Sequence, residues 1–349
     1  MRFIALAAMT TVAAAFSGLS PARAESAPAI TGPVTHGNLA IYFIHGEGAP
    51  GPVPLTLQEG MAKGTVRVVE TGSVNELRIE NTGDEDVYVQ SGDMVKGGRQ
   101  DRVLTVSFVL PRKSGEMPVA AYCVEHGRWS QRGAEEVTTF AGSNNALPSR
   151  EAKLAMKAPL LADAPAGASG QTISYSETGE RQRAVWNEVA KTQEKLSGGV
   201  NAPVAAAASA TSLELSLEND KLKELRAEYV KALEDKAAGS GIIGFVFAVN
   251  GRINSADVYP SNGLFRKMWV KLLTASVTEA VAGMKDGQDG NAPSIEAVRE
   301  FLAAAEKGKA NAQKIGNLAH QETRDADAAL FVAAARPSGE WVHRNYLAK

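Results

Sequence analysis

The sequence predicts an α+β fold: a β-rich N-terminal half, built as an antiparallel sandwich or partly open barrel, and a helical C-terminal half containing a β-hairpin and closing strands. Three observations predict it. Residues 36–140 hold short β-branched and aromatic runs separated by Gly, Asn, Asp and Pro, which is typical of strands and turns. From residue 181 onward, apolar residues recur at helical spacing. Asn250-Gly251 between two apolar runs indicates a tight hairpin. We therefore expect a single domain over residues 36–349.

The first 24 residues have the pattern of a secretory signal peptide. Arg2 precedes an apolar stretch, and Ala22-Arg23-Ala24 resembles a signal-peptidase site. The stretch is short for a membrane span, and no stop-transfer pattern follows it. An uncleaved anchor is the alternative. We expect a chain that begins at Glu25 and is periplasmic or secreted.

The composition of the mature chain limits its partners. Removing Arg2 and Arg23 with the signal changes the formal charge from −2 to −4. A weakly acidic chain without a basic run argues against nucleic acid or an anionic membrane as the partner. No second apolar stretch is long enough to span a membrane. The single cysteine excludes an internal disulfide, so stability must come from packing.

The β-rich half is expected to begin after a flexible segment. Residues 25–35 are rich in Pro, Ala and Thr and are predicted to be flexible. Strands of alternating or continuous apolar character follow, and one pair flanks an Asn-Thr-Gly-Asp turn. They lie in residues 38–46, 64–72, 74–95, 102–111 and 119–124. The predicted sheet has roughly six to eight strands.

The second half is expected to follow a loop. Residues 141–180 are rich in Ala, Pro, Gly and Ser and are predicted to be a loop or linker, with room for one short helix. Residues 197–212 form a low-complexity, alanine-rich interruption, interpreted as a linker or a flexible cover. Apolar stripes predict helices on both sides of this interruption. The stripes comprise Val185, Val189 and Leu196, and then Leu222, Leu225, Tyr229 and Leu233.

The last third of the chain carries the clearest local signals. Residues 242–259 predict a hairpin around Asn250-Gly251, whose positions both favour positive φ. A helix is predicted from the Ser261-Asn262 cap, and another from Ser294. A final hairpin is expected around Pro337-Ser338-Gly339. The apolar face of the first of these helices comprises Leu264, Phe265, Met268, Trp269 and Leu272.

The only cysteine lies in the segment AAYCVEHGRWS, residues 120–130. In a strand, Val119, Ala121 and Cys123 share one apolar face, which favours a buried cysteine. A nucleophilic cysteine needs a lowered thiol pKa and a base within hydrogen-bond reach. His126 would point to the opposite face unless the chain turns after Val124. A structural Cys123 is therefore favoured, with the nucleophile as the alternative.

The residues after Cys123 are a second candidate site. Gly127 permits a turn, so Glu125 and Arg128 either pair with each other or face a ligand. The alternative is a surface turn with Trp129 as a packing anchor. Together with Asp93, Glu125 and His126 are the candidate catalytic acid/base residues.

The third candidate is the glycine-rich segment 90–102. It matches neither the P-loop nor a dinucleotide-binding fingerprint, since a strand follows it. Successive glycines expose backbone N–H groups that can form an anion-binding nest. The alternative is a β-turn in which Asp93 and Asp101 balance the cations. The candidate ligand-binding residues are Lys96, Gly97, Gly98, Arg99, Asp101, Arg102 and Arg128.

Two common site types are missing from the sequence pattern. The five histidines form no H-x-H or H-E-x-x-H motif, so no metal site is predicted. No G-x-S-x-G elbow marks a serine hydrolase. We predict no cofactor.

Several of these segments, in this order, resemble the family of domains associated with ADP-ribosylglycohydrolases and rhodanese-phosphatases, a domain of unknown function. The resemblance runs from about residue 32 to residue 347. It is carried by GDMVKGGRQDRV, PVAAYCVEHGRW, AVWNEVA, and GFVFAVNGRINSADVY followed by LFRKMWVKLL. The family name implies gene association with ADP-ribose and phosphate chemistry and supplies no catalytic residues.

Three functional hypotheses follow. The first is an exported protein that binds an anionic, phosphorylated or nucleotide-like small molecule in a cleft between the glycine-rich segment and the Glu125–Arg128 turn. The second is a hydrolase or transferase acting on such a ligand, with Glu125 or Asp93 as acid/base or Cys123 as nucleophile. The third is a protein–protein adaptor that uses the alanine-rich segment 200–212 as a mobile contact.

Overall fold

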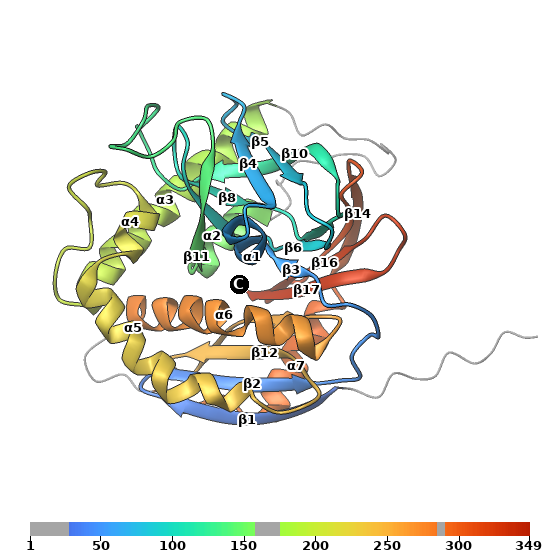
Figure 1. Cartoon of the computed structure of the whole chain (residues 1–349). Helices are drawn as coiled ribbons and strands as arrows, with labels where there is room; N and C mark the ends of the chain where they lie inside the picture. The colour runs from blue at the N-terminus through green and yellow to red at the C-terminus, as the bar shows by residue number, and fades with distance from the viewer. Residues whose placement is uncertain (1–27, 158–174, 285–289) are drawn as a thin grey trace, which may run out of the picture.

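The computed structural model describes residues 28–157, 175–284 and 290–349, so the predicted signal peptide lies outside the described residues. A large antiparallel sheet forms the base and right side of the molecule in Figure 1. Its eight strands run in the order β1-β2-β12-β13-β17-β16-β15-β14. They are β1 (Ala29–His36), β2 (Leu39–His45), β12 (Ile242–Val249), β13 (Arg252–Val258), β14 (Lys309–Ile315), β15 (Ala319–Asp325), β16 (Ala329–Ala335) and β17 (Trp341–Ala348).

Two smaller sheets form the upper part of the molecule in Figure 1. One has the order β11-β7-β8-β10-β5-β4 and the other the order β3-β6-β9; only β3 and β6 pair in parallel among the described strands. Their strands are β3 (Leu55–Thr56), β4 (Val66–Glu70), β5 (Glu76–Asn81), β6 (Val87–Val89), β7 (Asp93–Gly97), β8 (Arg102–Leu104), β9 (Phe108–Leu110), β10 (Gly115–Cys123) and β11 (Phe140–Ala146).

Helices cover the sheets and connect them. They are α1 (Leu57–Ala62), α2 (Arg150–Lys157), α3 (Tyr175–Gly199), α4 (Leu213–Leu217), α5 (Asp220–Leu233), α6 (Asn262–Ala282) and α7 (Ile295–Ala305), with a 3₁₀ turn at Glu234–Ala237. α6 lies between the large sheet and the upper β-strands (Figure 1), whereas α7 packs against the opposite face of the large sheet. No helix in the described ranges is both long and apolar enough to cross a membrane.

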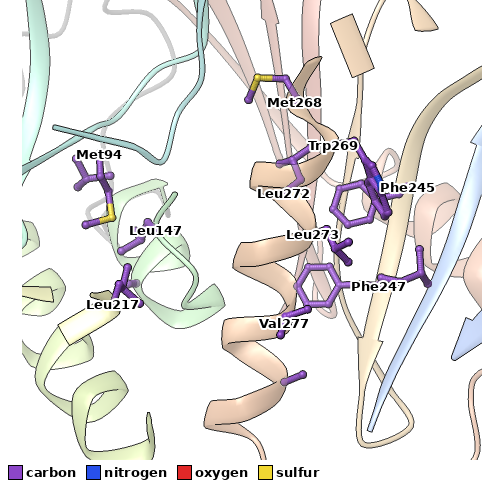
Figure 2. Close-up of a cluster of buried hydrophobic side chains, with 14 of the residues drawn as sticks. Met94, Leu147, Leu217, Phe245, Phe247, Met268, Trp269, Leu272, Leu273 and Val277 are labelled. Carbon is purple, nitrogen blue, oxygen red and sulfur yellow. The ribbon is translucent and has the colours of Figure 1, made fainter. Parts of the chain in front are cut away.

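The two faces of the large sheet bury two different cores. Alternate residues of β2 separate accordingly: Phe43 joins the core that contains α6, and Tyr42 joins the core that contains α7, as a period of two requires. Figure 2 shows Phe245 and Phe247 of β12 facing Trp269 and Leu273 of α6. Full burial of each such side chain stabilises the fold by about 1.5–3 kcal/mol.

The structure confirms the α+β fold and several predicted element boundaries. The Ser261 hydroxyl accepts a hydrogen bond from the Leu264 N–H at the start of α6, and Ser294 caps α7 in the same way. Asn250 and Gly251 have φ values of 51° and 74° and join β12 to β13 as the hairpin prediction requires.

Two of the loop predictions are wrong, and the first concerns residues 25–35. The sequence predicts a flexible segment there, but β1 begins at Ala29 and pairs with β2. The pairing is interrupted between Thr31 and Val34, beside Pro33, and a proline is tolerated there because β1 is an edge strand. The low apolar content of β1 conceals it in the sequence.

The second wrong prediction concerns residues 141–180, where the sequence predicts a loop with room for one short helix. α2 (Arg150–Lys157) is such a helix, but β11 continues to Ala146 and pairs with β7, and α3 begins at Tyr175. Small and polar residues conceal β11 in the sequence. Backbone pairing with β7 and the packing of Leu147 and Ala152 in the core stabilise these elements instead.

Candidate functional site

The turn after β10 places Glu125 inside the protein, and its side chain is 0% exposed. Arg128 binds the carboxylate with two nitrogens, Nε to Oε1 and Nη2 to Oε2, both at 2.7 Å. The Asp101 N–H donates to Oε2 at 3.1 Å, and the Ser209 hydroxyl donates to Oε1 at 2.5 Å. Both carboxylate oxygens are therefore already engaged by donors of the chain itself.

Asp101 is the second buried carboxylate of this region. Arg132 donates to both of its oxygens, at 2.8 and 2.9 Å, and the Ser212 hydroxyl donates to Oδ2 at 2.6 Å. Arg132 also lies 3.4 Å from Glu125. Two acids and two guanidinium groups balance one another in this region. We name this group the Glu125 cluster; it comprises Asp101, Glu125, Arg128, Arg132, Ser209 and Ser212.

The glycine-rich segment adopts the backbone conformation expected for an anion nest, because Gly97 and Gly98 both have positive φ. Its backbone N–H groups, however, already donate hydrogen bonds to acceptors within the protein. Gly97 N–H donates to Asp101 at 2.9 Å, Arg99 N–H to Glu70 at 3.2 Å, and Gly98 N–H to the Glu136 carbonyl. The anions that this segment binds in the structure are the protein's own carboxylates.

The predicted cations differ in how they are paired. Arg102 is fully buried and forms an ion pair with Glu70 at 3.2 Å. Lys96 pairs with Glu218 at 2.6 Å. The guanidinium group of Arg99 instead lies 5.4 Å from the ring centroid of Trp129, and it forms no ion pair with an acid in the described part of the chain. Arg99 is thus a cation of this segment without an acidic partner for its guanidinium group among the described residues.

The alanine-rich segment closes over the Glu125 cluster. Besides the contacts of Ser209 and Ser212, the Thr211 hydroxyl donates to the His126 carbonyl at 2.7 Å, and Val204 is buried in the main core. Gln193 of α3 donates to the carbonyl of residue 210 at 3.0 Å. In the structure, residues 200–212 are held in place by these contacts.

Cys123 faces the core, as strand alternation predicts, and it is 0% exposed. Burial raises the pKa of its thiol to about 12, although Arg102 lies 2.9 Å from the sulfur and acts in the opposite sense. Gln182 of α3 binds both the N–H and the carbonyl of Cys123, at 2.8 and 2.9 Å. A nucleophilic thiol requires a lowered pKa, so burial and a raised thiol pKa favour the structural interpretation of Cys123.

His126 lies away from the Glu125 carboxylate, at the edge of a groove of about 400 Å³. Its ring contacts the Trp186 ring edge-on, with the two ring centroids 4.5 Å apart. The Trp186 indole N–H donates to the Glu125 carbonyl at 3.0 Å, which ties α3 to the turn. We name this the His126 groove; it is lined by His126, Arg183, Trp186, Asn187, Val189, Ala190, Gln193 and Thr211.

Asp93 belongs to neither group. It is 1% exposed, accepts the Gln90 N–H at 2.8 Å, and forms an ion pair with Lys271 of α6. The structure therefore brings Glu125, Asp101 and Arg128 together with the glycine-rich segment, but it separates Asp93 and His126 from them.

Protonation of Glu125 is disfavoured. Burial by itself would raise the pKa of this carboxyl group, but the hydrogen bonds from Arg128 and Ser209 lower it below the usual value for glutamate. Glu125 is therefore ionised at neutral pH. Among the described residues, no group of three or more His, Cys, Asp or Glu side chains is arranged to hold a metal ion.

Sequence reasoning did not identify four residues of this region, namely Arg132, Arg183, Ser209 and Ser212. The first lies seven residues beyond Glu125 with no motif around it, and the two serines lie in a low-complexity segment. Arg183 carries a detectable signal, since a helix that presents apolar positions 185 and 189 to the core turns Arg183 toward solvent.

A family model described as the ARG and Rhodanese-Phosphatase-superfamily-associated Protein domain matches residues 28–347. The chain belongs to this family. In this family member, the segments around the glycines and around Cys123 form the two sides of the Glu125 cluster, and α3 closes it. No curated protein and no solved structure matches the chain.

Proposed function

We propose that this protein is exported through its N-terminal segment and binds a small anionic, phosphorylated or nucleotide-like ligand in the His126 groove. The observation that carries the proposal is Arg183. Its side chain is exposed in the groove, and it forms no ion pair with an acidic side chain in the described part of the chain. Arg102, Arg128 and Arg132, by contrast, are all paired with carboxylates.

The chemistry of the groove supports a ligand that combines a ring with an anion. A guanidinium group forms bidentate hydrogen bonds with phosphate. The Trp186 and His126 rings offer an aromatic surface, and Asn187 offers an amide to polar edges of a ligand. Grooves with apolar walls and few polar groups are the usual form of small-molecule sites.

Thermal-shift and calorimetric titrations with ADP-ribose, phosphosugars and inorganic phosphate test this proposal, because a ligand that binds only the folded state raises its melting temperature. Arg183→Ala is expected to weaken binding about 10- to 100-fold, the usual effect of losing a charge-assisted hydrogen bond. Arg299→Ala, which changes an exposed arginine on α7, is the matched control and should bind normally.

Arg99→Ala distinguishes the two possible anion sites. Loss of binding in this variant alone would assign the ligand to the glycine-rich segment beside Trp129. Loss in Arg183→Ala alone assigns it to the His126 groove. No shift with any anion, or normal binding in both variants, would overturn the proposal.

A hydrolase or transferase is the second hypothesis, with Asp93 as its candidate acid/base residue. Asp93 is a buried acid that forms an ion pair with the buried ammonium group of Lys271. A substrate panel tests this hypothesis. Equal turnover by wild type and Asp93→Asn would reject Asp93 as the acid/base residue.

A further inference from the structure

Three residues far apart in the sequence form a buried hydrogen-bonded chain outside the Glu125 cluster. Ser107 precedes β9, His343 lies on β17, and Asp257 lies on β13. Ser107 Oγ is 3.0 Å from His343 Nδ1, and His343 Nε2 is 2.9 Å from Asp257 Oδ1. All three are at most 4% exposed. We name these three residues the His343 relay.

The direction of each hydrogen bond follows from the chemistry of the groups. Asp257 accepts hydrogen bonds from Asn345 Nδ2 at 3.0 Å and from His343, so it acts as a carboxylate. His343 Nε2 must then carry the hydrogen. Burial lowers the pKa of His343, an effect that Asp257 opposes only in part. The imidazole is therefore neutral, and its Nδ1 is left to accept the Ser107 hydroxyl hydrogen.

Ser107 is also held from its other side. The Ser91 N–H donates to Ser107 Oγ at 2.9 Å, so the Ser107 lone pairs and hydroxyl hydrogen have fixed directions. The Tyr259 ring stacks on His343 with a centroid distance of 5.1 Å. These contacts fix the serine and the imidazole in the orientation in which a proton passes between them.

Open space adjoins this arrangement. Gly92, next to Ser91, is buried and has φ of 101°. Apart from its chain neighbours Ser91 and Asp93, no described residue has an atom within 4 Å of a Cβ built on Gly92. By contrast, a Cβ on buried Gly98 would lie 2.3 Å from Phe140. The backbone next to the Ser91 N–H that binds Ser107 therefore leaves room for a further atom.

We propose that Ser107 is a nucleophile of a second, acyl-transfer site, with His343 as its general base and Asp257 as the group that orients His343. The substrate class is a small carboxylic ester. Ser107 Oγ bonds to the carbonyl carbon while its proton passes to His343 Nδ1. The ester C–O bond then breaks, and the alcohol leaves with the proton from His343. Water hydrolyses the acyl-serine by the same proton transfers in reverse.

Labelling with phenylmethylsulfonyl fluoride tests this, because the sulfonyl group bonds to an activated serine while fluoride leaves and His343 takes the proton. Intact mass and peptide mapping should find one adduct, at Ser107. Ser107→Ala should abolish it. His343→Gln and Asp257→Asn should slow it about 100-fold or more, as expected for loss of general-base catalysis. The wild-type rate should fall in acid, as His343 protonates, and be constant at neutral pH.

Ser276→Ala is the matched control, because Ser276 is also buried and its hydroxyl donates to the Leu272 carbonyl within α6, outside the relay; it should label at the wild-type rate. Circular dichroism establishes which variants are folded. If His343→Gln does not fold, Asp257→Asn provides the test of the labelling rate. No adduct on folded protein, an adduct elsewhere, or an unchanged rate in both variants would overturn the proposal. Ser107→Ala should leave ligand binding in the His126 groove unchanged, so the two proposals fail separately.

Discussion

The Glu125 cluster and the His343 relay are both buried and polar, but they are built in opposite ways. In the cluster, Asp101 and Glu125 each face a guanidinium group, and the four charged residues lie within residues 101–132. In the relay, Ser107, Asp257 and His343 come from three separate strands or loops, and the carboxylate faces an imidazole rather than a guanidinium group.

The two regions differ in how the charge of their buried carboxylates is balanced. Buried ions need a partner of opposite charge and donors for the remaining lone pairs, and the cluster supplies both. The relay instead holds an ionised acid against a neutral imidazole, which leaves proton acceptance available at His343. A buried carboxylate whose charge is fully balanced by cations has a structural role, whereas a buried carboxylate beside a neutral titratable group is typical of reactive sites.

The largest expected effect is in the cluster. Arg132→Ala removes the bidentate partner of Asp101 and leaves this buried carboxylate with only the longer ion pair to Arg128, at 3.7 Å. We expect a loss of about 3–5 kcal/mol of unfolding free energy, measured by urea denaturation. Lys63→Ala, which breaks the exposed pair with Glu85, is the control and should change stability by less than about 1 kcal/mol. Equal effects in the two variants would contradict the compensation argument.

The next effect concerns the alanine-rich segment that covers the cluster. Ser212→Ala removes the hydroxyl that donates to Asp101 at 2.6 Å. A hydrogen bond to a charged group contributes about 1.5–3 kcal/mol, so we expect a loss of that size. Hydrogen exchange should also become faster in residues 200–212. If exchange there is already as fast as at the chain ends in the wild type, the segment is not held by the cluster.

The relay should appear in the pH dependence of stability. Burial lowers the pKa of His343 below the unfolded value of about 6.5. The charge of Lys157 lowers this pKa further, whereas the charges of Asp257 and Asp93 raise it. The unfolded chain therefore binds more protons between those two pKa values, and stability is expected to decrease as the pH falls from about 7 toward 5. Urea titrations of wild type and His343→Gln measure this, and the decrease should be smaller in the variant. An identical slope would contradict a neutral His343.

The smallest effect on stability is expected at Cys123. Cys123→Ala removes one buried sulfur atom, at a cost of about 1 kcal/mol. In the wild type, the raised pKa and full burial predict that a thiol reagent reacts slowly until denaturant unfolds the chain. Rapid stoichiometric labelling of the folded protein would restore the nucleophile hypothesis.

Local chemistry made much of the fold predictable. Ser261 and Ser294 precede strong helical periodicity, and Asn250-Gly251 specifies its own turn. β1 and β11 escape prediction because their apolar content is low, and they exist because a neighbouring strand supplies their backbone hydrogen bonds. Strands that are stabilised mainly by backbone hydrogen bonds to a neighbouring strand have only a weak sequence pattern of their own.

The candidate sites divide in the same way. By itself, the sequence determined that Cys123 faces a core and that Glu125 and Arg128 follow it at a turn, because strand alternation and a glycine turn act over a few residues. Only the tertiary structure decided what such groups meet. The Ser212 hydroxyl reaches its carboxylate partner across 111 positions, and Ser107 reaches the His343 ring across 236. Such pairs arise from how helices, strands and loops are arranged in space, which local spacing does not encode.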